Sequence, residues 1–125
     1  MVIGLLDTNI LVDILRLYQP AVNWLSNGGE LGVSAVVWLE LIQGAENGHD
    51  QRKALKLLEH FERFEPDAAD FRWAIGQLTK FSLSHNVSGV DCLIAATPYR
   101  MQLPLYTQNL KHLAPLLGKL AQKPY

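Results

Sequence analysis

Three acidic side chains interrupt the most apolar stretches of this sequence. Asp7 ends the run VIGLL, Glu40 lies inside VVWLELI, and Asp91 directly precedes CLIAA. Most of the other acids lie in polar stretches; Asp13 has apolar neighbours, but Arg16 follows it by one helical turn and can pair with it. A carboxylate in apolar surroundings is unfavourable unless something satisfies its charge or it stays protonated. Asp7, Glu40 and Asp91 are therefore the first candidates for chemistry.

Three carboxylates that met at one place would repel one another, and a divalent cation is the usual remedy. Ligation by oxygen, with little nitrogen and no sulfur, suits Mg²⁺ or Mn²⁺ rather than zinc. Gly44 and Ala95 each follow one of these acids by one helical turn, so they leave room for an ion or a ligand. The residue types thus indicate a metal site if the fold brings the three acids together.

Each of the three acids also has an ordinary structural explanation. Asp7 could cap the helix that follows it. Asp91 could be the fourth residue of a capping box that begins at Ser88. Glu40 could reach solvent at the edge of its helix, although a helix that is apolar on nearly all sides is normally buried. These alternatives stay open at the level of the sequence.

The composition bounds the kind of protein. The chain has 125 residues, which predicts one domain over residues 1–125, and 49% of them are apolar, enough for a packed core. The net charge of −1 argues against a surface that binds nucleic acid through positive charge alone. The single cysteine, Cys92, excludes an intramolecular disulfide, and no segment looks like a membrane span or a leader, so we expect a soluble cytoplasmic protein.

The pattern of apolar residues predicts strands that alternate with helices. We expect strands at 2–6, 30–34, 63–66 and 103–107, and helices at 8–18, 20–27, 35–48, 50–61, 68–85 and 89–102, followed by a turn of helix and an edge strand. Such alternation predicts an α/β fold with a central parallel sheet flanked by helices on both faces. Ligands bind such sheets at the carboxyl ends of the strands, where Asp7 would lie.

Three motifs resemble a known family. LLDTNILVDIL, WLELIQG and GVDCLIAATPYRMQLPLYTQNLKHL, in this order, are similar to the PIN domain in the compact form of VapC-like toxins of type II toxin–antitoxin systems. The resemblance covers nearly the whole chain. It implies a PIN-like three-layer sandwich and an endoribonuclease that depends on Mg²⁺ or Mn²⁺. It also implies an RNA substrate cut to a 5′-phosphate and a 3′-hydroxyl, a cognate antitoxin that inhibits the enzyme, and a homodimer.

The family's acidic ligands fall on the three solitary acids. The resemblance makes Asp7, Glu40 and Asp91 both catalytic and metal-binding, with support from Thr8, Asn9, Thr107 and Asn109. Many family members have a further aspartate three residues after that asparagine, where this chain has His112. Asn109 or His112 could replace the missing acid, and the choice between one and two metal ions stays open.

RNA must also be held by residues outside the acids. Arg16, Arg100 and Lys111 are the basic residues near the motifs, although surface charge is the simpler explanation for any one of them. The early helices carry more apolar side chains than one core face needs, and the resemblance suggests that an antitoxin peptide covers them: Leu11, Leu15, Leu17, Tyr18, Val22, Trp24 and Leu25. The later helices would form the homodimer.

Other classes of protein fit the sequence less well. A phosphatase of the haloacid dehalogenase type needs a second aspartate two residues after Asp7, where this chain has Asn9. A phosphoacceptor receiver domain needs an adjacent acidic pair near its start, which is absent. The main alternative is a PIN-fold interaction module that binds a protein partner and has weak or no catalytic activity. The sequence does not indicate which RNA is cut.

Overall fold

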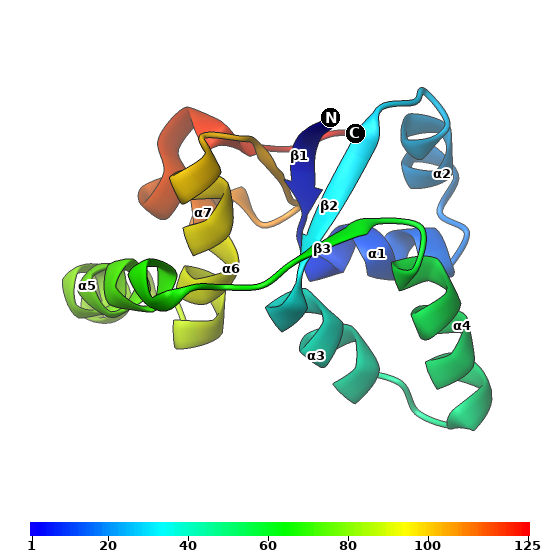
Figure 1. Ribbon diagram of the computed structural model, residues 1–125, viewed down its shortest axis with the longest axis horizontal. Helices are drawn as coiled ribbons and strands as arrows, with labels where there is room; N and C mark the ends of the chain where they lie inside the picture. The colour runs from blue at the N-terminus through cyan, green and yellow to red at the C-terminus, as the bar shows by residue number, and fades with distance from the viewer.

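A five-stranded parallel sheet forms the centre of the computed structural model, which describes residues 1–125 (Figure 1). The strands lie in the order β3-β2-β1-β4-β5 and every neighbouring pair is parallel. Their bounds are β1 Val2–Leu6, β2 Glu30–Ser34, β3 Glu62–Phe64, β4 Leu105–Tyr106 and β5 Ala121–Gln122. The predicted α/β fold class is confirmed.

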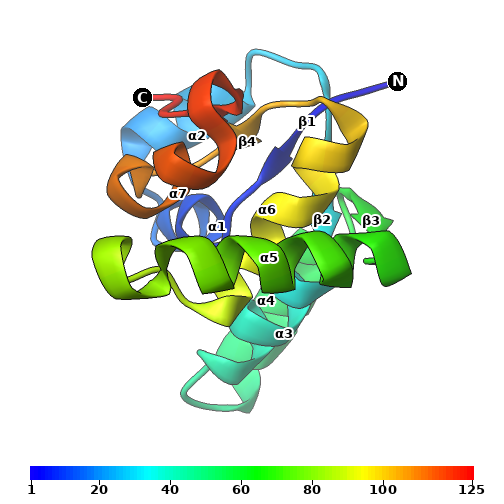
Figure 2. The ribbon, with the colours of Figure 1, turned by 90° about the vertical axis from the view of Figure 1, so that its left-hand side faces the viewer.

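Helices cover both faces of this sheet. Their bounds are α1 Thr8–Leu15, α2 Gln19–Leu25, α3 Ala35–Gln43, α4 Gly48–Leu58, α5 Ala68–His85, α6 Gly89–Met101 and α7 Leu110–Leu117, followed by a short 3₁₀ helix, Gly118–Leu120. α1, α2 and α4 lie on one side of the sheet in Figure 1, and α5, α6 and α7 lie on the other. Figure 2 shows α5 lying across α6.

No helix combines the length and the apolar character needed to cross a membrane.

The core lies where the central strand meets the helices on either side. Leu5 and Leu6 of β1 are fully buried, as are Ile10 and Leu11 of α1 and Ile94 of α6. A central strand of a parallel sheet is covered on both faces, which explains why its sequence is a continuous apolar run rather than an alternating one. Asp7 is the first residue after this run, at the carboxyl end of the central strand.

Several helix boundaries differ from the sequence-based prediction. α1 ends at Leu15 instead of continuing to Tyr18, because Leu17 adopts a left-handed conformation with φ of 59°. The Tyr18 N–H donates to the Asp13 carbonyl and the Leu17 N–H to the Ile14 carbonyl, a Schellman motif that closes the helix.

The third and fourth predicted helices also have different ends. α3 stops at Gln43, with Gly44 as its C-cap, rather than at residue 48. α4 begins at Gly48 rather than at residue 50, and its N-cap is Asn47, whose side chain accepts the Asp50 N–H. The Ser34 and Asp67 side chains cap α3 and α5.

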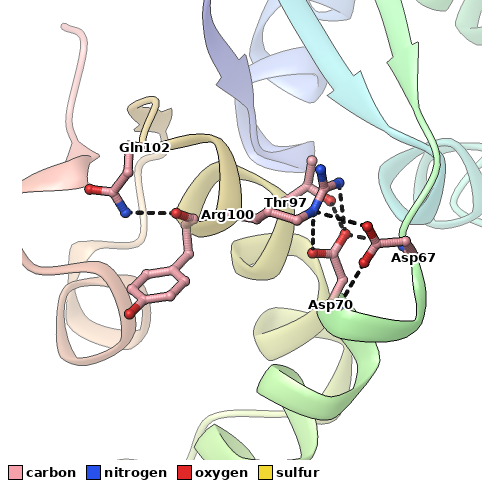
Figure 3. A network of polar contacts seen from close by, with 6 residues as sticks. Asp67, Asp70, Thr97, Arg100 and Gln102 are labelled. Atoms are coloured by element: carbon pink, nitrogen blue, oxygen red, sulfur yellow. Dashed lines mark hydrogen bonds and ion pairs between the residues drawn. The ribbon is translucent and has the colours of Figure 1, made fainter.

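A buried carboxylate joins α5 to α6. Asp70 is 1% exposed and accepts hydrogen bonds from both Nε and Nη2 of Arg100, at 2.8 and 3.1 Å, and from the Thr97 hydroxyl at 3.0 Å (Figure 3). Asp67 completes a capping box with Asp70 and lies 3.4 Å from Arg100. Burial disfavours the charged Asp70, but the hydrogen bonds outweigh it, so the pKa of Asp70 lies below its ordinary value.

We therefore expect Asp70→Asn to lower the free energy of unfolding by about 2 kcal/mol at pH 7, because hydrogen bonds to charged groups contribute roughly 1.5–3 kcal/mol. A carboxyl with a lowered pKa stabilises the fold above its ordinary pKa of about 4, and this contribution disappears as the pH falls through the lower, folded-state pKa. Urea unfolding of the variant and the wild type between pH 3 and pH 7 measures both effects. Glu59→Gln, at an exposed position, is the control; equal stability of Asp70→Asn and wild type at pH 7 would contradict the assignment.

Candidate functional site

The three solitary acids line one cavity at the carboxyl edge of the sheet. Asp7 comes from the end of β1, Glu40 from α3 and Asp91 from the first turn of α6. The cavity has a volume of about 500 Å³. The same cavity is lined by Thr8, Asn9, Val12, Asp13, Arg16, Gly44 and Asn109. The fold thus brings together acids that lie up to 84 residues apart in the chain.

Both carboxylate oxygens of Asp7 are held by hydrogen bonds. Asp7 is 7% exposed and caps α1, and its Oδ1 accepts the Thr8 N–H at 2.8 Å. Its Oδ2 accepts the Thr107 hydroxyl at 2.8 Å and the Asn9 side-chain amide at 3.3 Å. The capping explanation for Asp7 and its place in the cavity are therefore both realised by one side chain.

The residues after β1 and the residues after β4 form one hydrogen-bonded network around Asp7. The Asn9 amide also donates to the Thr107 hydroxyl oxygen at 3.3 Å, and its Oδ1 accepts the Gln108 N–H at 3.0 Å. Thr107 is fully buried and accepts the Asn109 N–H at 2.9 Å. Parallel pairing of β1 with β4 places these two segments next to each other. Thr107 and Asn9 thereby orient the Asp7 carboxylate.

Glu40 lies at the edge of the cavity rather than in the core. Its Oε1 accepts the Thr8 hydroxyl at 2.6 Å, and its side chain is half-buried. The expectation that its helix is buried on nearly all sides is wrong, because Leu39 is 68% exposed. Gly44, one turn later, lines the cavity and leaves space beside the carboxylate.

Asp91 combines the capping role with a place in the cavity. The Ser88 hydroxyl accepts the Asp91 N–H, and the Asp91 Oδ2 accepts the Ser88 N–H at 3.2 Å, which completes the predicted capping box. The same Oδ2 lies 3.9 Å from Nδ1 of His112, and that ring nitrogen is 3.1 Å from the Asn109 amide. Asn109 is part of the cavity lining, whereas His112 is not.

The other two acids raise the cost of ionising Asp7. Burial raises the pKa of Asp7 above its ordinary value; the Thr107 hydroxyl and the Thr8 N–H act in the opposite direction, and the charges of Asp91 and Glu40 raise it further. A cation placed among these groups would relieve both burial and repulsion. The site is thus one where positive charge is favoured.

The donor set fits a hard divalent cation. Every candidate ligand that lines the cavity offers oxygen, from carboxylates or the Asn109 amide, which suits Mg²⁺ or Mn²⁺. No three His, Cys, Asp or Glu side chains are close enough together to hold one ion as they stand. Coordination of one ion by Asp7, Glu40 and Asp91 together therefore requires side-chain rotation, which Glu40 can make by leaving the Thr8 hydroxyl.

The structure separates the three basic residues that the sequence suggested for RNA contact. Arg16 lines the acid cavity. Arg100 is bound by Asp70 and Asp67 between α5 and α6, outside the cavity, which argues against Arg100 as an RNA contact (Figure 3). Lys111 is exposed on α7 and is not part of the cavity lining.

Asp13 is a cavity residue that the sequence analysis set aside. We expected it to pair with Arg16, but no such ion pair forms; its Oδ2 instead accepts the Tyr125 hydroxyl at 2.6 Å. Asp13 thus adds a fourth carboxylate to the cavity lining. The only sequence signal was its apolar surroundings, since Tyr125 lies 112 residues away.

Comparison with known proteins identifies the family. The PIN domain profile matches residues 4–113, so the chain belongs to the PIN domain family. No curated protein matches its sequence. The fold is similar to a chain of a toxin–antitoxin complex from Klebsiella pneumoniae, with 24% identity, 98% of each chain covered and a TM-score of 0.81.

Two further solved structures share this fold. A chain of FitAcB from Neisseria gonorrhoeae is 23% identical over 90% of this chain and 93% of its own, with a TM-score of 0.70. A chain of DNA-bound VapBC from Salmonella typhimurium is 22% identical over 90% of this chain and 91% of its own, also with a TM-score of 0.70. At these identities the likeness establishes the fold.

The raised pKa of Asp7 predicts how the metal-free protein responds to pH. A carboxyl whose folded-state pKa is raised destabilises the fold above that pKa, and the penalty disappears below the ordinary pKa of about 4. We expect Asp7→Asn to raise Tm at pH 7 in EDTA, since asparagine also caps helices well, and to lose this advantage near pH 4. Thermal unfolding followed by circular dichroism measures the difference. Glu59→Gln serves as the control, and a lower Tm for Asp7→Asn at pH 7 would contradict the prediction.

Proposed function

We propose that this protein is a metal-dependent endoribonuclease that acts as the toxin of a toxin–antitoxin pair. The observation that carries the proposal is the meeting of Asp7, Glu40 and Asp91 in one cavity at the carboxyl edge of a PIN-domain sheet. The raised pKa of Asp7 supports it, because a group of acids that disfavours its own ionisation favours a cation. The solved structures with this fold include toxin–antitoxin complexes, which supports the toxin assignment.

In this mechanism Asp7, Glu40 and Asp91 would hold Mg²⁺ or Mn²⁺. Such an ion would supply a water of lowered pKa and positive charge at the scissile phosphate. Thr107 and Asn9 would keep the Asp7 carboxylate aimed at the cavity, and Glu40 would leave the Thr8 hydroxyl to reach the ion. Asp7 or Asp91 accepts the proton of the attacking water. Attack in line leaves a 5′-phosphate and a 3′-hydroxyl.

The purified protein should cleave single-stranded RNA in Mn²⁺ or Mg²⁺, and excess EDTA should abolish cleavage. Asp7→Asn should lower the rate by at least about a hundredfold, because it removes a ligand and a charge at the reacting phosphate. Denaturing gel electrophoresis of end-labelled RNA measures the rate, and circular dichroism checks the fold of the variant. Glu59→Gln should cleave like the wild type. Undiminished cleavage in EDTA would refute the role of the metal.

The same assay distinguishes the toxin from an inactive PIN-fold interaction module. The separation of the three acids and the histidine at position 112 are the observations that favour the inactive module. Calorimetric titration with Mn²⁺ should give heat for the wild type and none for Asp7→Asn. If neither RNA cleavage nor Mn²⁺ binding is found, the interaction module is the better assignment.

The antitoxin would cover the apolar surface of the early helices. Leu17 and Tyr18, between α1 and α2, are 77% and 51% exposed. The prediction that Leu11 contacts a partner is wrong, because Leu11 is fully buried in the core. Trp24 packs against Tyr106 within the same chain. A small DNA-binding protein encoded next to the toxin gene should inhibit RNA cleavage when it is added in stoichiometric amount.

The homodimer would use α5 and α6. Large apolar side chains of these two helices are exposed, including Phe71, Ile75, Val90 and Tyr99. Phe71 and Ile75 also line a shallow cavity of about 150 Å³ with Leu93 of α6. We expect Ile75→Glu to convert the dimer to monomer in sedimentation velocity, since a buried charge disfavours the interface. Leu39→Glu, which replaces an exposed apolar residue of α3 by the same acid, should leave the dimer intact. A monomeric wild type would contradict the proposal.

A further inference from the structure

We infer that Arg16 binds the RNA phosphate next to the one that is cut, and that Tyr125 keeps Arg16 available by holding Asp13. This inference rests on the proposed function. It names the contact that positions the RNA strand, and it assigns a task to the C-terminal tyrosine, which lies outside the part of the chain that the family profile matches.

Arg16 is the only positively charged residue of the ten that line the acid cavity. It also lines a second cavity of about 330 Å³ between α1, α3 and α4, which shares Thr8, Val12, Glu40 and Gly44 with the first. Arg16 is the only cation there as well. If one phosphate of an RNA strand lies among the acids, Arg16 is therefore the only positively charged side chain in the lining of these two cavities that a neighbouring phosphate can contact. The planar guanidinium of arginine matches phosphate oxygens with two parallel hydrogen bonds.

The guanidinium of Arg16 forms no ion pair, and the nearest acid along the helix, Asp13, accepts a hydrogen bond from another residue. Asp13 precedes Arg16 by three residues on α1, a spacing at which opposite charges attract. Arg16 nevertheless forms no ion pair, and Oδ2 of Asp13 accepts the Tyr125 hydroxyl at 2.6 Å. An exposed arginine that is left unpaired beside an acidic cavity can bind an anion without first breaking a salt bridge.

Two features hold this arrangement in place. The Schellman motif ends α1 directly after Arg16, so the residue is the C-cap of the helix and its backbone is fixed. Tyr125 packs with its ring centroid 6.0 Å from that of Tyr18 and 6.2 Å from that of Trp24. Burial and the contact with Asp13 raise the pKa of Tyr125 to about 12, so its hydroxyl stays a donor across the physiological range.

Steady-state cleavage of RNA in Mn²⁺ tests the contact. We expect Arg16→Ala to raise KM about tenfold and to change kcat less than about threefold, because the contact lies outside the reacting groups. The negative slope of log(kcat/KM) against log[salt] should become shallower by about 0.7, the value for one phosphate contact on a single strand. Arg16→Lys should recover part of the loss. Arg72→Ala, an exposed arginine of α5 without an ion pair, is the matched control and should behave like the wild type.

Tyr125 is tested by one single and one double variant. Tyr125→Phe should release Asp13 to pair with Arg16 and raise KM about threefold. Tyr125→Phe combined with Asp13→Asn should restore the wild-type KM, because no carboxylate is left to occupy the guanidinium. A merely structural role for Tyr125 predicts no such rescue, so failure of the double variant to recover would overturn the assignment of Tyr125.

Equilibrium binding separates this inference from the proposed function. Fluorescence anisotropy with a labelled single-stranded RNA in EDTA reads binding without cleavage. Weaker binding and a reduced salt slope for Arg16→Ala support the phosphate contact even if the wild type does not cleave RNA. Unchanged binding and unchanged KM overturn it. If Arg16→Ala affects only inhibition by the antitoxin, Arg16 belongs to the protein interface instead.

Discussion

The hydrogen bond from the Thr107 hydroxyl to the Asp7 carboxylate is the contact on which the site depends. Asp7 is a nearly buried acid at the end of the central strand, and such a group is tolerated only where polar partners surround it. Thr107 lies 100 residues later and reaches Asp7 because β4 pairs with β1. The parallel sheet therefore does more than support the cavity, since its register decides which hydroxyl meets which carboxylate.

The need of a buried acid for polar partners also explains why much of the site could be predicted from the sequence. A buried strand shows itself as a continuous apolar run, and an acid at its end stands out against that run. Asp7 could be placed in this way, and Asp91 by its capping box. Glu40 could be found as well, although its surroundings were misjudged, because the sequence does not show which side of an apolar helix, here that of Leu39, the fold leaves uncovered.

The residues that sequence reasoning missed are tied by contacts over long chain distances. Asp13 seemed to have a local partner in Arg16, but Tyr125 binds it from 112 residues away. Arg100 seemed free to contact RNA, but Asp70 binds it from 30 residues away. Local spacing predicts that two charges can meet, and only the packing of distant elements decides whether a better partner reaches one of them first. The early end of α1 has the same character, since nothing in its composition requires Leu17 to adopt a positive φ.

Arg16 and Arg100 show how the fold assigns different tasks to one residue type. Both lie at the C-terminal end of a helix, where a positive charge is favourable. Arg100 faces a buried carboxylate on the adjacent helix and becomes a structural link between α5 and α6. Arg16 lies three residues after Asp13, whose carboxylate accepts the Tyr125 hydroxyl, and it lines the cavity without an ion pair. The difference lies in the surroundings of the acids, because Asp70 is buried on the adjacent helix and binds both Arg100 and the Thr97 hydroxyl, whereas Asp13 accepts the Tyr125 hydroxyl and forms no ion pair with Arg16.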